Sequence, residues 1–237
     1  MKRIFTAALF IGAIAACSLS TVAQSESRDD ILKKIQASRA EVQQLENKFL
    51  EPSPEDMSAN AEFLQQPDTG ITRLLPREIF DKNILSTRGG GAYYSFTGRT
   101  HEYGKGTQIG YEQDSLSVSF AGADYGMLVR LGDLPLNAVN SESPAVIFLA
   151  SYNPAIEEPQ ARSEYHRFAT GVRVENVLYK THQEAIVNNT YVLRGIHYSD
   201  SDVLVAFRIV RKDLDDSIII LWKLLRKYPK PVLARAD

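Results

Sequence analysis

Cysteine is almost missing from this chain of 237 residues, since the only one, Cys17, lies at the end of an N-terminal apolar run. A lone thiol forms no internal disulfide and builds no zinc or iron–sulfur site that needs several cysteines. An excess of positive charge is also missing, because 27 Lys and Arg side chains are balanced by 29 Asp and Glu side chains. This balance gives no electrostatic basis for binding nucleic acid.

Long apolar runs are missing beyond residue 16. A transmembrane helix needs about 20 consecutive apolar residues. The segment SIIILWKLL (217–225) comes nearest, but it is short and contains Lys223. The composition, with 44% hydrophobic and 24% charged residues, is that of an ordinary globular protein.

The N-terminus has the pattern of a secretory signal peptide. Lys2 and Arg3 precede an apolar run over residues 4–16, which is too short to span a bilayer. We therefore expect residues 1–23 to be removed on export, and the mature protein to be periplasmic or secreted.

The site of cleavage has two alternatives. The sequence IAAC, which ends at Cys17, resembles the lipobox of bacterial lipoproteins, and the resemblance implies lipidation of Cys17 and anchoring in the cell envelope. The other alternative is ordinary cleavage before Gln24, where Thr21 and Ala23 are the small residues that signal peptidase prefers. We favour the ordinary cleavage.

Residues 24–70 are predicted to be a helical N-terminal segment. Apolar residues follow one another at steps of four and three over residues 31–49, with Ser38 in the remaining slot, which predicts a narrow apolar stripe on a helix. The stripe is expected to pack on its own domain, and the alternative is a homo-oligomer formed through residues 29–50. A second helix is predicted over residues 53–67, with Ser53 as N-cap, Pro54 in the first turn and Asp56 at the capping-box position.

Residues 71–237 are predicted to form a β-rich domain. Alternating segments on both sides of Gln113 and Asp114 predict a hairpin, and the apolar runs 126–136 and 145–152 have strand length. Three apolar runs near the C-terminus, separated by the acidic turns SDSD and DLDD, predict an antiparallel meander. The middle run is apolar on both faces, so it belongs at the centre of a sheet that is covered on both sides. The predicted fold class is α+β: an N-terminal helical hairpin followed by a mainly antiparallel sheet that is sandwich-like or covered by helices.

Between the runs, the proline-rich and charged segment 153–168 is predicted to begin as a loop and to contain a short helix at 161–168. Loops of this kind carry many ligand contacts in proteins.

The segment STRGGGAYYSFTGRTHEYGKG, residues 86–106, is the most unusual in the chain. A phosphate loop would need a helix directly after the glycines, whereas these glycines precede an aromatic run typical of a strand. We therefore predict a β-hairpin in which glycine allows a positive φ or relieves crowding beside bulky rings. Arg88 and Arg99 are the candidates for holding an anion.

His101 and Glu102 are adjacent, so on a strand they point to opposite faces and do not bind one metal ion together. No other histidine lies at a metal-ligand spacing from His101, so no metal site and no cofactor are predicted. Tyrosines around Tyr94 suit either a core or the binding of a sugar or protein.

These patterns favour an exported, non-enzymatic envelope protein that acts as a binding or assembly module for a protein or glycan partner. The candidate ligand-binding residues are Arg88, Tyr94, Arg99 and His101. The alternative is an exported hydrolase with a site assembled from scattered residues, for which His101, Glu102 and His166 are the candidates. The sequence favours the module because no nucleophile or metal motif is present in it.

Overall fold

The computed structural model describes residues 26–80, 85–118 and 122–234. The chain divides into two compact units between Arg39 and Ala40, inside the first helix. The predicted signal peptide, with Cys17 and Gln24, lies outside the described residues. Among the residues that are described, no helix combines the length and the hydrophobicity needed to cross a membrane.

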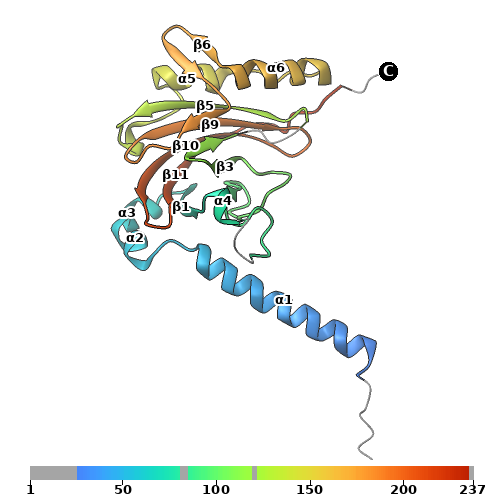
Figure 1. Ribbon diagram of the computed structural model, residues 1–237. Helices are drawn as coiled ribbons and strands as arrows, with labels where there is room; N and C mark the ends of the chain where they lie inside the picture. The colour runs from blue at the N-terminus through green and yellow to red at the C-terminus, as the bar shows by residue number, and fades with distance from the viewer. Residues whose placement is uncertain (1–25, 81–84, 119–121, 235–237) are drawn as a thin grey trace, which may run out of the picture. The chain divides into compact units, whose positions relative to one another are not determined.

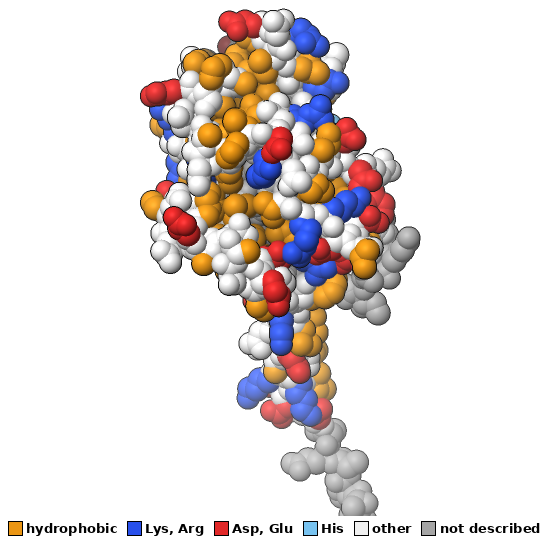
Figure 2. Space-filling model, turned by 90° about the vertical axis from the view of Figure 1, so that its left-hand side faces the viewer, with side chains coloured by type: hydrophobic (Ala, Val, Ile, Leu, Met, Phe, Trp, Pro, Cys, Tyr) orange, Lys and Arg blue, Asp and Glu red, His pale blue; other side chains and the backbone are white. Residues whose placement is uncertain are grey.

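Helix α1 (Arg28–Leu50) is the predicted first helix, and it carries an exposed apolar stripe. Figure 2 shows hydrophobic side chains along one side of this helix. Its exposed large apolar side chains are Ile31, Leu32, Ile35, Val42, Leu45 and Phe49. In the unit that begins at Ala40, α1 instead buries Glu46 and Leu50, each one position after a stripe residue. The expected packing of the stripe is therefore wrong at this end of α1, because hydrogen bonds from Ser86 and Thr87 hold Glu46 inward. Self-association through residues 29–50 stays a prediction.

The predicted second helix is confirmed at its start and is divided in two at Asn60, into α2 (Pro54–Ala59) and α3 (Ala61–Leu64). Ser53 and Asp56 form the predicted capping box, with each side chain bonded to the backbone N–H of the other residue. The buried carboxylate of Asp56 also accepts a hydrogen bond of 2.9 Å from Nη2 of Arg211. The cap therefore also attaches α2 to the sheet of the body.

The described residues of the body form three antiparallel sheets, and their presence after the N-terminal helices confirms the predicted α+β class (Figure 1). The largest has the strand order β1-β11-β10-β9-β5, and the second has the order β2-β3-β4-β8. The strands of the first sheet are β1 (Thr69–Leu74), β5 (Tyr125–Gly132), β9 (Thr190–His197), β10 (Ser201–Lys212) and β11 (Ile218–Lys227). The strands of the second sheet are β2 (Tyr93–Tyr94), β3 (Ile109–Glu112), β4 (Ser115–Ser117) and β8 (His182–Glu184). The third sheet is the hairpin of β6 (Val172–Val174) and β7 (Val177–Tyr179).

The predicted C-terminal meander is confirmed as β9, β10 and β11, with β10 between the other two. Strand β10 is apolar on both faces because both faces of the large sheet are covered. Leu204 and Ala206 belong to one core, whereas Val205 and Phe207 belong to another. The predicted hairpin turn at Gln113–Asp114 is also confirmed, and both of its residues have positive φ.

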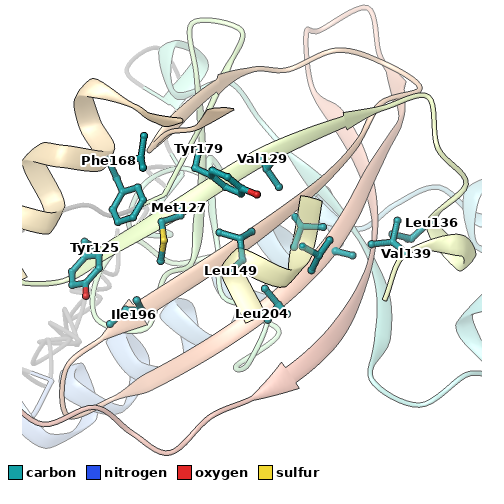
Figure 3. Close-up of a cluster of buried hydrophobic side chains, with 14 of the residues drawn as sticks. Tyr125, Met127, Val129, Leu136, Val139, Leu149, Phe168, Tyr179, Ile196 and Leu204 are labelled. Atoms are coloured by element: carbon teal, nitrogen blue, oxygen red, sulfur yellow. The ribbon is translucent and has the colours of Figure 1, made fainter. Parts of the chain in front are cut away.

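The first core lies between the large sheet and the helices α5 (Pro144–Ser151) and α6 (Glu158–Thr170), which cover one face of the sheet in Figure 1. Figure 3 shows Phe168 of α6 next to Met127 of β5, and Leu149 of α5 near the middle of the same cluster. Helix α6 confirms the predicted short helix and extends it on both sides.

The second core lies between the large sheet and the second sheet, which contains β2, β3, β4 and β8. Tyr94 and Phe96 contribute to it from the glycine-rich segment, and Trp222 contributes from β11. The ring of Tyr94 lies 5.4 Å from that of Phe96 in an edge-on arrangement, which confirms that these two residues share a face.

The strand prediction for residues 145–152 is wrong, because residues 144–151 form helix α5. Pro144 occupies the first turn, where its missing N–H is tolerated. A short run that is apolar on all sides has no period by which a strand is distinguished from a buried helix. The remaining short elements are α4 (Arg77–Phe80) and a 3₁₀ turn (Leu136–Ala138).

Candidate functional site

The glycine-rich segment 86–106 consists mostly of turns. Within it the predicted hairpin is limited to the bridge of Ser95 and Thr100, and β2 pairs antiparallel with β3, which follows the segment. Gly89, Gly90 and Gly91 all have positive φ, as predicted. The chain then enters the short strand β2 and not a helix, which excludes the geometry of a helical phosphate loop.

Two of these glycines also relieve crowding, as predicted. A Cβ atom on Gly89 would lie 2.5 Å from the ring of Tyr93, and one on Gly91 would lie 2.4 Å from a methyl group of Leu50. These two glycines therefore let the segment approach both its own tyrosine and the end of α1.

A cavity of about 580 Å³ lies beside this segment and is lined by all four predicted ligand-binding residues. Its wall comes from the C-terminal end of α1 and the loop after it, from β1, and from the segments around residues 86–88 and 99–102. The structure thus brings Arg88, Tyr94, Arg99 and His101 to one place. Its volume is within the range of ordinary small-ligand sites.

His101 holds the cavity wall against β1. Its Nε2 atom lies 2.7 Å from the carbonyl oxygen of Arg73 and 2.9 Å from Oγ1 of Thr72. Because a carbonyl oxygen only accepts, Nε2 carries the proton and donates it. Burial lowers the pKa of His101 below its ordinary value of 6.5, although the hydrogen bond to the Arg73 backbone acts in the opposite direction. The imidazole is therefore neutral at pH 7.

Tyr94 is buried, with only 5% of its surface exposed, which agrees with the core alternative for these tyrosines, although Tyr94 also lines the cavity. Its ring lies 5.0 Å from the imidazole of His101. Burial raises the pKa of Tyr94 to about 12, and the nearby groups Arg99, Trp222 and Thr72 moderate the rise. Tyr94 is thus a neutral hydroxyl group in the wall of the cavity.

Arg88 and Arg99 each stack on an aromatic ring. The guanidinium carbon of Arg88 lies 5.3 Å from the centre of the Tyr103 ring, and that of Arg99 lies 5.2 Å from the centre of the Trp222 ring. Stacking fixes the plane of a guanidinium group and leaves the N–H groups at its edge free to bind.

The charges of these two arginines are not matched within the described part of the chain. Eight other arginines hold a carboxylate: Arg73, Arg77, Arg130, Arg162, Arg167, Arg194, Arg208 and Arg211. Arg88 and Arg99 make no ion pair with any described residue, although both lie at the same cavity. Glu51 and Glu102 also line this cavity, so its charges are mixed.

Glu46 attaches the glycine-rich segment to α1. Its carboxylate accepts hydrogen bonds from the backbone N–H groups of Ser86 and Thr87 and from Oγ1 of Thr87, the last two at 2.8 and 2.6 Å. Burial alone would raise the pKa of Glu46, but these hydrogen bonds outweigh it and hold the pKa below the ordinary value of 4.5.

The residues suggested for a hydrolase are not all brought together. His101 and Glu102 line the cavity, whereas His166 lies exposed on α6 and outside the cavity lining. Within residues 26–80, 85–118 and 122–234, no group of three His, Cys, Asp or Glu side chains is arranged to hold a metal ion.

Several residues of the cavity were not found from the sequence. Thr72 comes from β1, Gln43 and Asn47 come from α1, and Trp222 lies beneath Arg99. Their contribution depends on contacts between distant parts of the chain, for which the sequence carries no local pattern. Of these residues, only Trp222 stands out in the sequence, because it is the only tryptophan of the chain.

Comparison of the chain with models of known protein families, with curated protein sequences and with solved structures found no match.

Proposed function

We propose that this protein is an exported, non-enzymatic binding or assembly module of the cell envelope, and that its ligand carries an anionic group into the cavity beside the glycine-rich segment. The observation that supports the proposal is the pair Arg88 and Arg99. Both guanidinium groups are stacked on rings, lie at one cavity and make no ion pair with a described residue.

A carboxylate is the group that fits this pair best. A guanidinium group and a carboxylate form two parallel hydrogen bonds in one plane, which gives both affinity and orientation. The neutral His101 and Tyr94 add polar groups without adding charge. The amide side chains of Gln43 and Asn47, joined by a hydrogen bond of 3.0 Å, provide further donors and acceptors from α1.

Trp222 supplies a direct test. It is the only tryptophan of the chain, it is buried, and its ring lies under Arg99, so its fluorescence reports on the cavity. The mature protein is titrated with N-acetylglutamate and with glucuronate. We expect a saturable change of tryptophan fluorescence with at least one of these carboxylates.

The matched variants are Arg88→Gln and Arg173→Gln. Arg88→Gln removes one proposed ligand contact and leaves Arg99 over Trp222, whereas Arg173 is an exposed arginine on β6, away from the cavity. Arg88→Gln is expected to weaken the response and Arg173→Gln to preserve it. The proposal is overturned if neither carboxylate changes the fluorescence, or if both variants respond as the wild type does.

A further inference from the structure

Strand β1 is an edge strand of the large sheet, since its only neighbour in the strand order is β11. The N–H of Leu224 donates to the carbonyl of Asp68 at 2.8 Å, and Asp68 and Leu224 continue the register of the two strands. Because the direction of the backbone groups alternates along an antiparallel strand, Gly70, Thr72 and Leu74 face β11. Ile71 and Arg73 therefore direct their backbone N–H and C=O groups to the free edge.

One end of this free edge is capped by the glycine-rich segment. The N–H of Leu75 donates to the carbonyl of Gly91 at 3.1 Å, and His101 donates to the carbonyl of Arg73 at 2.7 Å. Ile71, one step further along the edge, has no such cap among the described residues, and it lines the cavity together with Thr72. The cavity therefore contains a short piece of unpaired strand edge.

We propose that the ligand is an extended peptide segment with an acidic residue, which adds to β1 as a further strand. Its main chain pairs with the N–H and C=O of Ile71, and its carboxylate binds Arg88 and Arg99. This inference rests on the proposed function and names its ligand class.

An extended peptide matches three features of the site together. Adding a strand to an exposed sheet edge is a recurring mode of peptide recognition, in which main-chain hydrogen bonds give affinity and side-chain contacts give specificity. The N–H and C=O of Ile71 at the strand edge need an acceptor and a donor at the spacing of a neighbouring strand. A peptide main chain has these groups at that spacing, whereas a sugar acid does not. Arg88 and Arg99, which make no ion pair with a described residue, are available to bind an anion, and the amides of Gln43 and Asn47 are able to bond further peptide groups.

The length of the peptide is limited by the caps. His101 closes the edge at Arg73, and Thr69, the outward-facing residue on the other side of Ile71, is buried, with its hydroxyl bonded to the carbonyls of Phe63 and Gln66, so pairing is confined to Ile71. At about 3.4 Å per residue, a segment of about four residues reaches across such an edge.

The test uses four probes on the full mature chain. They are the blocked peptide acetyl-Val-Glu-Val-Thr-amide, its analogue with Gln in place of Glu, a set of analogues N-methylated at one peptide bond each, and glucuronate. Binding is measured by calorimetry, and hydrogen exchange of the Ile71 amide is followed by NMR. We expect the Glu peptide to slow exchange at Ile71, and the Gln analogue and at least one N-methyl analogue to bind about tenfold more weakly.

The outcomes separate this inference from the proposed function. If glucuronate binds as tightly as the Glu peptide and no N-methyl group weakens binding, an anion site remains and strand addition is overturned. Equal affinity for the Glu and Gln peptides overturns the acidic peptide as the ligand class. If the Glu peptide does not bind, this inference is overturned, and if glucuronate and N-acetylglutamate also fail to bind, the proposed function falls with it.

Discussion

The imidazole Nε2 of His101 donates a hydrogen bond of 2.7 Å to the carbonyl oxygen of Arg73 at the free edge of strand β1. This bond joins the glycine-rich segment to the large sheet, and it determines where the open part of the edge begins. Burial around it keeps the imidazole neutral by lowering the pKa of His101 below 6.5.

The protein is expected to lose stability as the pH falls through the range below 6.5, because of His101. In that range the unfolded chain binds a proton that the folded chain does not, so the free energy of unfolding decreases as the pH decreases. His182, whose pKa is also lowered by burial, acts in the same direction. Denaturant unfolding measured between pH 7.5 and pH 5 tests this dependence.

The variant His101→Gln retains an N–H donor but does not titrate, so its stability should depend less on pH than that of the wild type. In contrast, His101→Ala leaves the Arg73 carbonyl without its donor and should lower the free energy of unfolding by about 1–3 kcal/mol. An identical pH dependence for wild type and His101→Gln would show that His101 is not the group responsible.

Glu46→Ala is expected to be strongly destabilising, because the N–H groups of Ser86 and Thr87 and the Thr87 hydroxyl lose their acceptor. A hydrogen bond to a charged group contributes about 1.5–3 kcal/mol, so we expect a loss of at least that size in denaturant unfolding at pH 7. The folded-state pKa of Glu46 is lowered, so its contribution is present above pH 4.5 and is lost as the pH falls through the folded-state value. Wild type and Glu46→Ala should therefore become more alike in stability in acid. A difference that stays constant down to pH 3 would contradict the role of the charged carboxylate.

Among the ion pairs of the described residues, that of Arg194 and Asp202 is the fully buried one, with side chains only 1% and 2% exposed. Nη2 of Arg194 donates to Asp202 at 2.8 Å, and Nη1 donates to the Leu149 carbonyl at 2.6 Å. Asp202→Ala leaves a buried guanidinium group without its carboxylate and should lower the free energy of unfolding by about 3–5 kcal/mol.

Asp133→Ala is the matched control, because Asp133 pairs with Arg208 but is 77% exposed. Surface pairs of this kind contribute about 0–1 kcal/mol. Thermal or denaturant unfolding of the two variants compares them directly. Equal effects would mean that burial does not set the strength of these pairs.

Alanine substitutions at Gly89 and Gly132 distinguish the cost of backbone strain from the cost of steric crowding. Their φ values are similar, +85° and +75°, but a Cβ atom on Gly89 meets the Tyr93 ring at 2.5 Å, whereas one on Gly132 meets nothing within 4 Å. Both Ala variants should lose about 1–2 kcal/mol through the left-handed conformation. Gly89→Ala should lose a further 1–3 kcal/mol, roughly, through overpacking. Equal losses in denaturant unfolding would contradict the role of glycine beside the tyrosine ring.

The sequence predicted those parts of the fold that depend on local patterns. The capping box at Ser53 and Asp56 was predicted because the cap needs only neighbours in the chain. The same holds for the positive φ of Gly89–Gly91 and for the turn at Gln113–Asp114. The two apolar faces of β10 also showed that both sides of the sheet would be covered.

The remaining parts depend on contacts between distant residues. Helix α5 was taken for a strand because its apolar residues have no period, and only the packing on β5 and β9 selects the helix. Arg88, Tyr94, Arg99 and His101 were chosen for their residue types, but the cavity exists only because β1 and the end of α1 also form its wall. The hydrogen bond that caps the strand edge at Arg73 comes from His101, which lies 28 positions later in the sequence. No local pattern therefore identifies Ile71 as the residue at which the edge is unpaired.

The most direct test of the anionic site is the dissociation constant of acetyl-Val-Glu-Val-Thr-amide for the wild type, for the double variant Arg88→Gln/Arg99→Gln, and for Arg173→Gln. Loss of the two charged contacts should weaken binding by at least about tenfold in the double variant, while Arg173→Gln binds as the wild type does. The same dissociation constant in all three proteins would contradict the account, because the two stacked arginines would then have no part in holding the ligand.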